Sequence, residues 1–157
     1  MELGARLAAD SDLDIVVALA RSAIEELRPL RGGSLWAEID ARTEPLDAVI
    51  TTELASTEHV VLVGTIDRTV VGYGAAHELS LHSGAAVARI TDLYVMPDAR
   101  GVGVGEQLLL GIEDWAREKG HAGLDSLALP GDRNTKNFFE SFGLVARAIE
   151  VHRSIDP

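Results

Sequence analysis

The stretch from Ile90 to Gly105 constrains this chain more than any other, because it joins three kinds of local structure in a fixed order. Apolar residues predict a strand up to Val95, a short turn contains Pro97, and a glycine-rich loop follows. Apolar residues then recur at helical spacing, and Gly120 is suited to end that helix. A strand that delivers glycines to a helix start favours an anion site, because the first helical turn has unpaired N–H groups and partial positive charge.

The expected ligand of this loop is a phosphate or pyrophosphate, held by Gly101, Val102, Gly103, Val104 and Gly105. Arg100 adds a permanent cation with a planar donor fork at the mouth of the loop. We exclude a Walker loop, because no Lys-Ser or Lys-Thr pair follows the second glycine. We also exclude the Rossmann fingerprint, because Glu106 stands where its last glycine belongs. Taken alone, the glycines favour a loop that only turns the chain; the order of strand, loop and helix favours the anion site.

The pattern that fits is Arg/Gln-x-x-Gly-x-Gly/Ala, filled here by Arg100, Gly103 and Gly105. It resembles the acetyl-CoA loop of the GCN5-related N-acetyltransferase (GNAT) family, in which the loop amides hold the pyrophosphate of coenzyme A. The resemblance implies acetyl-CoA as the acyl donor. It also implies that the strand before the loop offers backbone groups to the pantetheine arm and the thioester, at Leu93, Tyr94 and Val95.

The other expected elements follow the order of that fold. Strands are predicted at Leu3 to Leu7, His59 to Ile66, Thr69 to Leu79, Ala85 to Met96, Leu124 to Leu129 and Ala146 to Ile155. Besides the helix after the loop, helical spacing is found at Leu13 to Leu27, about Thr43 to Ala55, and Thr135 to Phe142, with a turn at Leu35 to Glu38. We predict an α+β protein with the GNAT fold: a mostly antiparallel sheet of six to seven strands with helices on both faces. The 157 residues suit a single domain, 1–157.

Composition narrows the function classes. Cysteine is absent, which excludes a cysteine acyl-enzyme, and the five histidines show no metal-ligand spacing, so no metal is expected. The net charge of −11 argues against nucleic acid and is compatible with a cationic amine as acceptor. No apolar run approaches about 20 residues, so we expect neither a membrane span nor a membrane partner. A cytoplasmic location is expected, and the resemblance implies a homodimer formed through the last strands.

Acetyl transfer to an amine requires few side chains. The amine must lose its proton, and the thioester oxygen needs a hydrogen-bond donor, typically a backbone N–H. Asp92 is the candidate base or amine-orienting carboxylate, because polyamine acetyltransferases of the family tend to carry an acid there, and strand alternation places it on the face of Tyr94. The other interpretation of Asp92 is a solvated or salt-bridged strand acid. Glu78 and His77 on the neighbouring strand are further candidates.

The late helix departs from the family pattern, in which an asparagine is followed seven residues later by a tyrosine that commonly protonates the CoA thiolate. Asp132 and Phe139 occupy these positions here. Phe139 has no hydroxyl, so its expected role is packing beside the cofactor. Tyr94 is on the right strand to supply a phenol instead. Asn134 is expected either to contact pantetheine or to cap the helix.

Three hypotheses follow. The first is an acetyl-CoA-dependent N-acetyltransferase that moves the acetyl group directly to a primary amine of a small molecule or a protein. The second is a non-catalytic acyl-CoA-binding module or sensor, which Phe139 favours. The third is an unrelated phosphate-binding α/β protein. In the resembled family the loop between the first two helices covers the acceptor pocket, which makes Trp36 and Glu38 candidates for its wall; the other interpretation of Trp36 is an anchor that holds this loop on the core.

Overall fold

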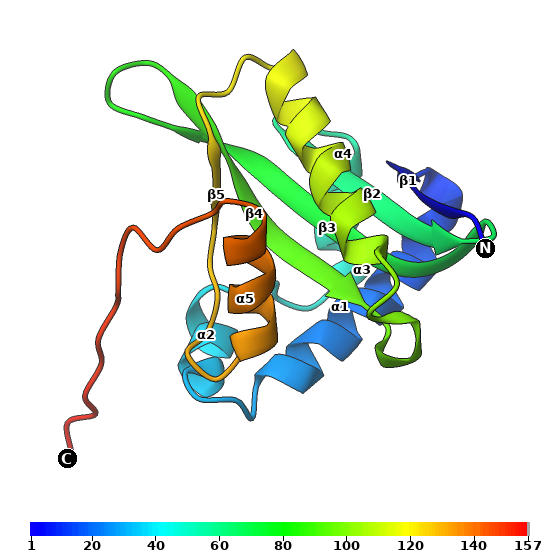
Figure 1. Ribbon diagram of the computed structural model, residues 1–157. Coiled ribbons are helices and arrows are strands. Elements are labelled where there is room, and N and C mark those ends of the chain that lie inside the picture. Colours follow the sequence, from blue (N-terminus) through cyan, green and yellow to red (C-terminus); the bar gives the residue numbers. More distant parts are fainter. Residues whose placement is uncertain (157) are drawn as a thin grey trace.

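Five strands form one mixed sheet in the computed structural model, which describes residues 1–156 (Figure 1). Their spatial order is their order in the chain, and every neighbouring pair is antiparallel except β4 and β5. The strands are β1 (Leu3–Leu7), β2 (His59–Ile66), β3 (Thr69–Ser80), β4 (Ala86–Val95) and β5 (Leu124–Ser126). Asp67 and Arg68 both have positive φ in the tight turn between β2 and β3, which confirms the predicted hairpin.

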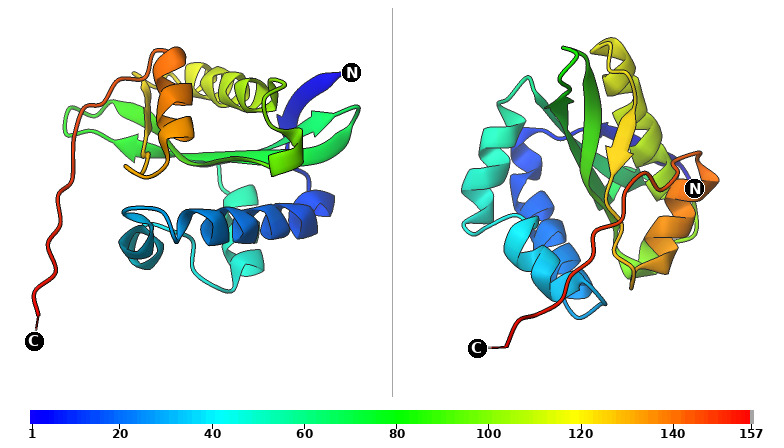
Figure 2. Two further views of the ribbon diagram at one scale, coloured as in Figure 1. Left: turned by 60° about the horizontal axis from the view of Figure 1, so that its bottom comes forward. Right: turned by 90° about the vertical axis from the view of Figure 1, so that its left-hand side faces the viewer.

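Helices cover both faces of the sheet (Figure 2). One face carries α1 (Leu13–Leu27), α2 (Gly33–Ile39) and α3 (Leu46–Leu54), and the other carries α4 (Val104–Glu118) and α5 (Arg133–Ser141). Two short 3-10 turns, Asp10–Asp12 and Pro97–Ala99, precede α1 and the glycine loop. The predicted α+β class, with helices on both faces of a mostly antiparallel sheet, is confirmed. Within residues 1–156 no helix is long and apolar enough to cross a membrane.

The hydrophobic core is divided in two by the sheet, because successive side chains of a strand point to opposite faces. Along β2, Val61 and Val63 pack toward α1 and α3, whereas Val60 and Leu62 pack toward α4. The cluster under α1 and α3 consists of Val16, Leu19, Ala20, Leu46, Ile50, Val61, Val63, Tyr73 and Ala75. The cluster under α4 and α5 consists of Val60, Leu62, Ala76, Ile90, Val104, Leu108, Leu109, Ile112 and Phe139.

Two sequence-based expectations are wrong. The predicted turn at residues 35–38 is part of the helix α2. The predicted strand at residues 146–155 is absent, so the sheet has five strands rather than six to seven. The physical reason is that β5 offers a partner of only three residues at its outer edge. Arg147 is bonded to Asp125 of β5, but beyond it the chain leads away from the sheet, with Ile149 85% and Val151 92% exposed (Figure 1).

The start of α2 packs against the end of α1 through Gly33, where a side chain has no room. A Cβ atom there would collide with the carbonyl oxygen of Leu27 and would lie 2.7 Å from that of Arg28. We expect Gly33→Ala to lower the free energy of unfolding by about 1–3 kcal/mol, the usual cost of overpacking. The melting temperature, measured by circular dichroism, should fall by about 5 °C. Gly123→Ala is the matched control, because nothing lies within 4 Å of its Cβ position; equal melting temperatures for the two variants would contradict the prediction.

Candidate active site

A cleft opens where β4 and β5 separate. The two strands are paired only over residues 88–90 and 124–126, after which β4 continues to Val95 while β5 ends. The cleft has a volume of about 1000 Å³ and is lined by residues 93–95 on one side and residues 127–129 on the other. Backbone groups on the separated strands no longer bond across the split, so an extended ligand can bond to them.

The glycine loop lies along this cleft and leads into α4. Gly101 and Gly103 have φ values of 81° and 109°, which favour glycine, and Gly103 is the N-cap of the helix. Within residues 1–156, the backbone amides of residues 101–106 donate to no protein acceptor. These amides remain available to an anion, which fits the pyrophosphate of coenzyme A. Of the predicted loop residues, all line the cleft except Val102.

Arg100 stands at the mouth of the loop, as expected, but it is already paired. Its guanidinium donates to both carboxylate oxygens of Glu26 in α1, at 2.7 and 2.9 Å, and its Nε donates to the carbonyl oxygen of Val95 at 2.7 Å. The guanidinium carbon also lies 5.3 Å from the centre of the Tyr94 ring. Hydrogen bonding to Glu26 raises the pKa of Arg100. Arg100 therefore holds the end of β4 against α1 besides supplying a positive charge.

Asp92 enters the cleft because β4 contains a bulge. Ile90 pairs with Ala76 and Asp92 pairs with Ala75, so Thr91 is an extra residue without a partner on β3. The bulge reverses the alternation: Ile90 packs in the cluster under α4, whereas Asp92 and Tyr94 face α1. Asp92 and Tyr94 share a face, as predicted.

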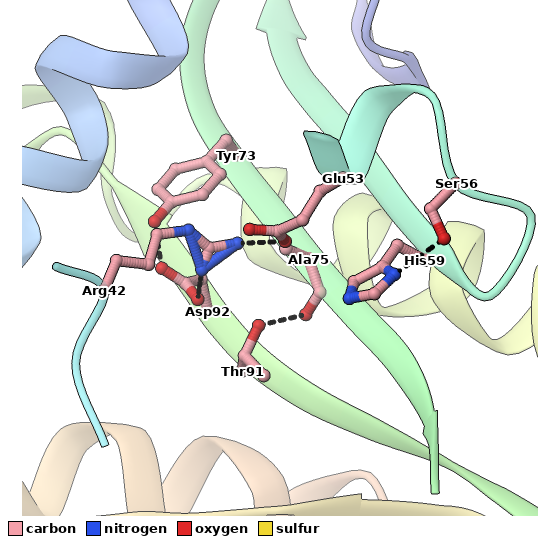
Figure 3. Close-up of polar contacts among 8 residues, drawn as sticks. All are labelled: Arg42, Glu53, Ser56, His59, Tyr73, Ala75, Thr91 and Asp92. Atoms are coloured by element: carbon pink, nitrogen blue, oxygen red, sulfur yellow. Dashed lines mark hydrogen bonds and ion pairs between the residues drawn. The ribbon is translucent and has the colours of Figure 1, made fainter. Parts of the chain in front are cut away.

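Asp92 belongs to a largely buried polar group that we call the Arg42 cluster: Arg42, Glu53, Tyr73 and Asp92 (Figure 3). The two terminal nitrogens of Arg42 bind Oδ1 of Asp92 at 2.8 Å and Oε1 of Glu53 at 2.6 Å. The hydroxyl of Tyr73 donates to Oδ2 of Asp92. Burial, together with Asp92, raises the pKa of the Tyr73 phenol well above its ordinary value, so the hydroxyl keeps its proton. Sequence reasoning missed Arg42 and Glu53, which belong to no motif and come from a loop and from α3.

Of the other residues predicted to contact the acceptor, only two line the cleft. His77 and Trp36 line the cleft, whereas Glu78 and Glu38 do not. Glu78 bonds instead to Nε2 of His121, at 3.1 Å, beyond the end of α4. The structure therefore does not bring Glu78 to Asp92.

Three phenylalanines, two in α5 and one at its C-cap, cover one side of the cleft. Phe138, Phe139 and Phe142 all line the cleft, and Phe139 also belongs to the core cluster under α4. Asn134 lines the cleft as well. It does not cap the helix, because the N-cap is Asp132, whose side chain accepts from the backbone N–H of Thr135.

Comparison with protein families identifies the class. Residues 18–144 match the acetyltransferase (GNAT) family, so the chain belongs to this family of N-acetyltransferases. No curated protein sequence matches the chain.

Solved structures share the fold over nearly the whole chain. A ribosomal-protein-alanine N-acetyltransferase from Brucella melitensis biovar Abortus 2308 is 18% identical and has a TM-score of 0.73, covering 99% of this chain and 100% of its own. AAC(6')-Iy, in complex with the bisubstrate analog CoA-S-monomethyl-acetylneamine, is 14% identical, with a TM-score of 0.76 and full coverage of both chains. An aminoglycoside acetyltransferase from an uncultured soil metagenomic sample, in complex with sisomicin, is 20% identical, with a TM-score of 0.73 and coverage of 99% and 96%.

Proposed function

We propose that this protein is a single-domain, acetyl-CoA-dependent N-acetyltransferase that transfers the acetyl group directly to a primary amine. The observation that supports it best is one continuous cleft that joins the amide-lined glycine loop to the Arg42 cluster. A donor and an acceptor bound at these two places meet at the split between β4 and β5. Positioning two bound reactants supplies much of the rate in such a reaction.

The donor half of the cleft fits acetyl-CoA. The amides of residues 101–106 bind the pyrophosphate, while the backbone of Leu93 and Val95 binds the pantetheine arm and the thioester. Asn134 and Phe139 line the same half, the first as a polar contact and the second as an apolar wall. The volume of about 1000 Å³ accommodates both the donor and a small acceptor.

The acceptor half holds the amine beside Asp92. An acceptor that arrives as an ammonium ion first loses a proton to solvent. The neutral amine then attacks the thioester carbonyl, forming the N–C bond, and the C–S bond breaks. The nitrogen loses a second proton to solvent, and CoA leaves as a thiolate that is then protonated. A backbone N–H in the split stabilises the negative charge that develops on the carbonyl oxygen. The aminoglycoside acetyltransferases of the same fold, and the negative charge of −11, support a cationic amine as acceptor.

Tyr94 is the proposed donor of a proton to the thiolate, because it lines the cleft at the end of β4 and a phenol carries its proton at neutral pH. We expect Tyr94→Phe to lower kcat by about tenfold, less than the usual contribution of a general acid, because a thiolate of conjugate pKa about 8.5 leaves with modest help. The ring under Arg100 is kept in this variant, so affinity for acetyl-CoA should not change. Thiol release in a stopped-flow or plate assay measures kcat, and an unchanged value would remove Tyr94 from the reaction.

Two measurements test the proposed function. Isothermal titration with acetyl-CoA should give a micromolar dissociation constant, and no binding would overturn the assignment. Thiol release is then measured with a panel of polyamines, amino acids, aminoglycosides and peptides. At least one amine should raise CoA release above the hydrolysis rate. Binding without amine-dependent release would favour the alternative, an acyl-CoA-binding module or sensor, which is suggested by phenylalanine at position 139.

A further inference from the structure

We infer that Arg42 is the positioning residue of the acceptor half: it holds Asp92 as a carboxylate that binds the incoming amine as an ammonium ion. This inference rests on the proposed function. It assigns a role to a residue outside every motif of the chain and decides between the two roles open to Asp92, namely base and amine-orienting carboxylate.

Arg42 lies in the loop between α2 and α3, and its side chain extends toward Tyr73 of β3 and Asp92 of β4 (Figure 3). Its side chain is only 8% exposed, and those of Glu53 and Asp92 are 13% and 17% exposed. Burial by itself would lower the pKa of Arg42, but Asp92 and Glu53 outweigh this effect, and the pKa lies above its ordinary value. Arg42 is therefore a permanent cation at the floor of the cleft.

Both oxygens of Asp92 are held by donors. Arg42 donates to Oδ1, and Tyr73, whose hydroxyl keeps its proton, donates to Oδ2. Without the negative charge of Asp92, the buried guanidinium would keep Glu53 as its only ion-pair partner. A carboxylate offers about four acceptor sites, so the remaining ones are free for further N–H groups. Asp92 is thus arranged to accept hydrogen bonds from an ammonium rather than to take its proton.

The charge balance of the Arg42 cluster also favours a cationic ligand. The cluster contains two carboxyl groups and one cation. Burial raises the pKa of Glu53 although Arg42 opposes it, and a further cation beside the two carboxyl groups would offset this effect. An ammonium beside Asp92 supplies the missing positive charge. Buried ion pairs contribute little net stability compared with apolar residues of the same volume, so binding the acceptor explains the cluster better than stability does.

The test is a double-mutant cycle on Arg42 and Asp92, run with the amine that gives the fastest CoA release. We expect Arg42→Met to raise the acceptor KM at least about tenfold and to leave the dissociation constant of acetyl-CoA within about twofold. Asp92→Asn should also raise the KM for the acceptor amine. The double variant should be no worse than the poorer single variant, because both changes remove the same interaction. Arg21→Met is the matched control: Arg21 pairs with Glu44 of the same loop at 2.7 Å, but both side chains are exposed.

The outcomes of this test distinguish failure of the Arg42 inference from failure of the proposed function. Losses that multiply in the double variant, or an Arg21→Met effect as large as that of Arg42→Met, would overturn the inference while the proposed function stands. A wild-type protein that releases no CoA with any amine would overturn both. If Arg42→Met does not fold, Arg42→Lys takes its place in the cycle, because an ammonium cannot bridge Asp92 and Glu53 as a guanidinium fork does.

Discussion

Gly103→Val should weaken the binding of acetyl-CoA by about 100-fold, equivalent to about 2.7 kcal/mol. The backbone at Gly103 has a φ of 109°, which a β-branched residue adopts only with strain of about 1–3 kcal/mol. A Cβ atom would also lie 3.1 Å from Cδ1 of Leu3. Relief of this strain turns the first amides of α4 away from the pyrophosphate, and each charge-assisted hydrogen bond lost costs about 1.5–3 kcal/mol.

The control for this prediction is Gly120→Val at the other end of the same helix. Gly120 also has a positive φ, of 73°, but nothing lies within 4 Å of its Cβ position and it does not line the cleft. Both variants should lose stability, and only Gly103→Val should lose affinity in isothermal titration. If a folded Gly103→Val variant bound acetyl-CoA as the wild type does, the glycine loop would not be the pyrophosphate site.

Asp92→Asn should reduce kcat/KM for the amine by about 100-fold. Removing one partner of a buried, hydrogen-bonded charge pair typically costs about 2–5 kcal/mol, and here the acceptor ammonium loses its partner too. Acetyl-CoA binding should be unchanged, because Asp92 lies outside the donor half of the cleft. The matched control is Glu78→Gln. It removes the other carboxylate that the sequence suggested as a base, which lies outside the cleft, and kcat/KM should stay within about threefold of the wild-type value.

The pH profile of Asp92→Asn separates the two roles of this carboxylate. If Asp92 orients the amine, the rise of kcat with pH reflects ionisation of the amine and remains in the variant. If Asp92 is the base, the rise shifts to higher pH in its absence. If Asp92→Asn kept full activity, or lost no more kcat/KM than Glu78→Gln, Asp92 would have no role in binding or activating the amine.

The parts of the molecule that could be predicted from sequence are those governed by local rules. The strand, glycine loop and helix from Ile90 to Gly120 were predictable because glycines with positive φ and a periodic apolar stripe are local signals. β2 was predicted with its exact bounds, since its valines and the following Asp67–Arg68 turn are equally local.

The parts that could not be predicted depend on distant contacts. The bulge at Thr91 is a mismatch between two strands and has no signature within β4 itself. Arg42 bonds to Asp92, which lies 50 residues away in sequence, and to Glu53, which lies 39 residues before Asp92, so only the tertiary structure shows that the three meet. The alternating residues near Val151 indicate a strand, but pairing requires a neighbour, and β5 is too short to be one.

The division of the core by the sheet affects which amino-acid substitutions this protein can accept during evolution. The Arg42 cluster rests on the layer formed by α1 and α3, whereas the glycine loop opens into α4 on the opposite layer. On the proposed function, side chains around the amine can therefore be exchanged without repacking those packed under α4, and the reverse is also true. An ancestral chain with this arrangement could acquire new acceptors by mutation in one layer while its donor chemistry stayed intact.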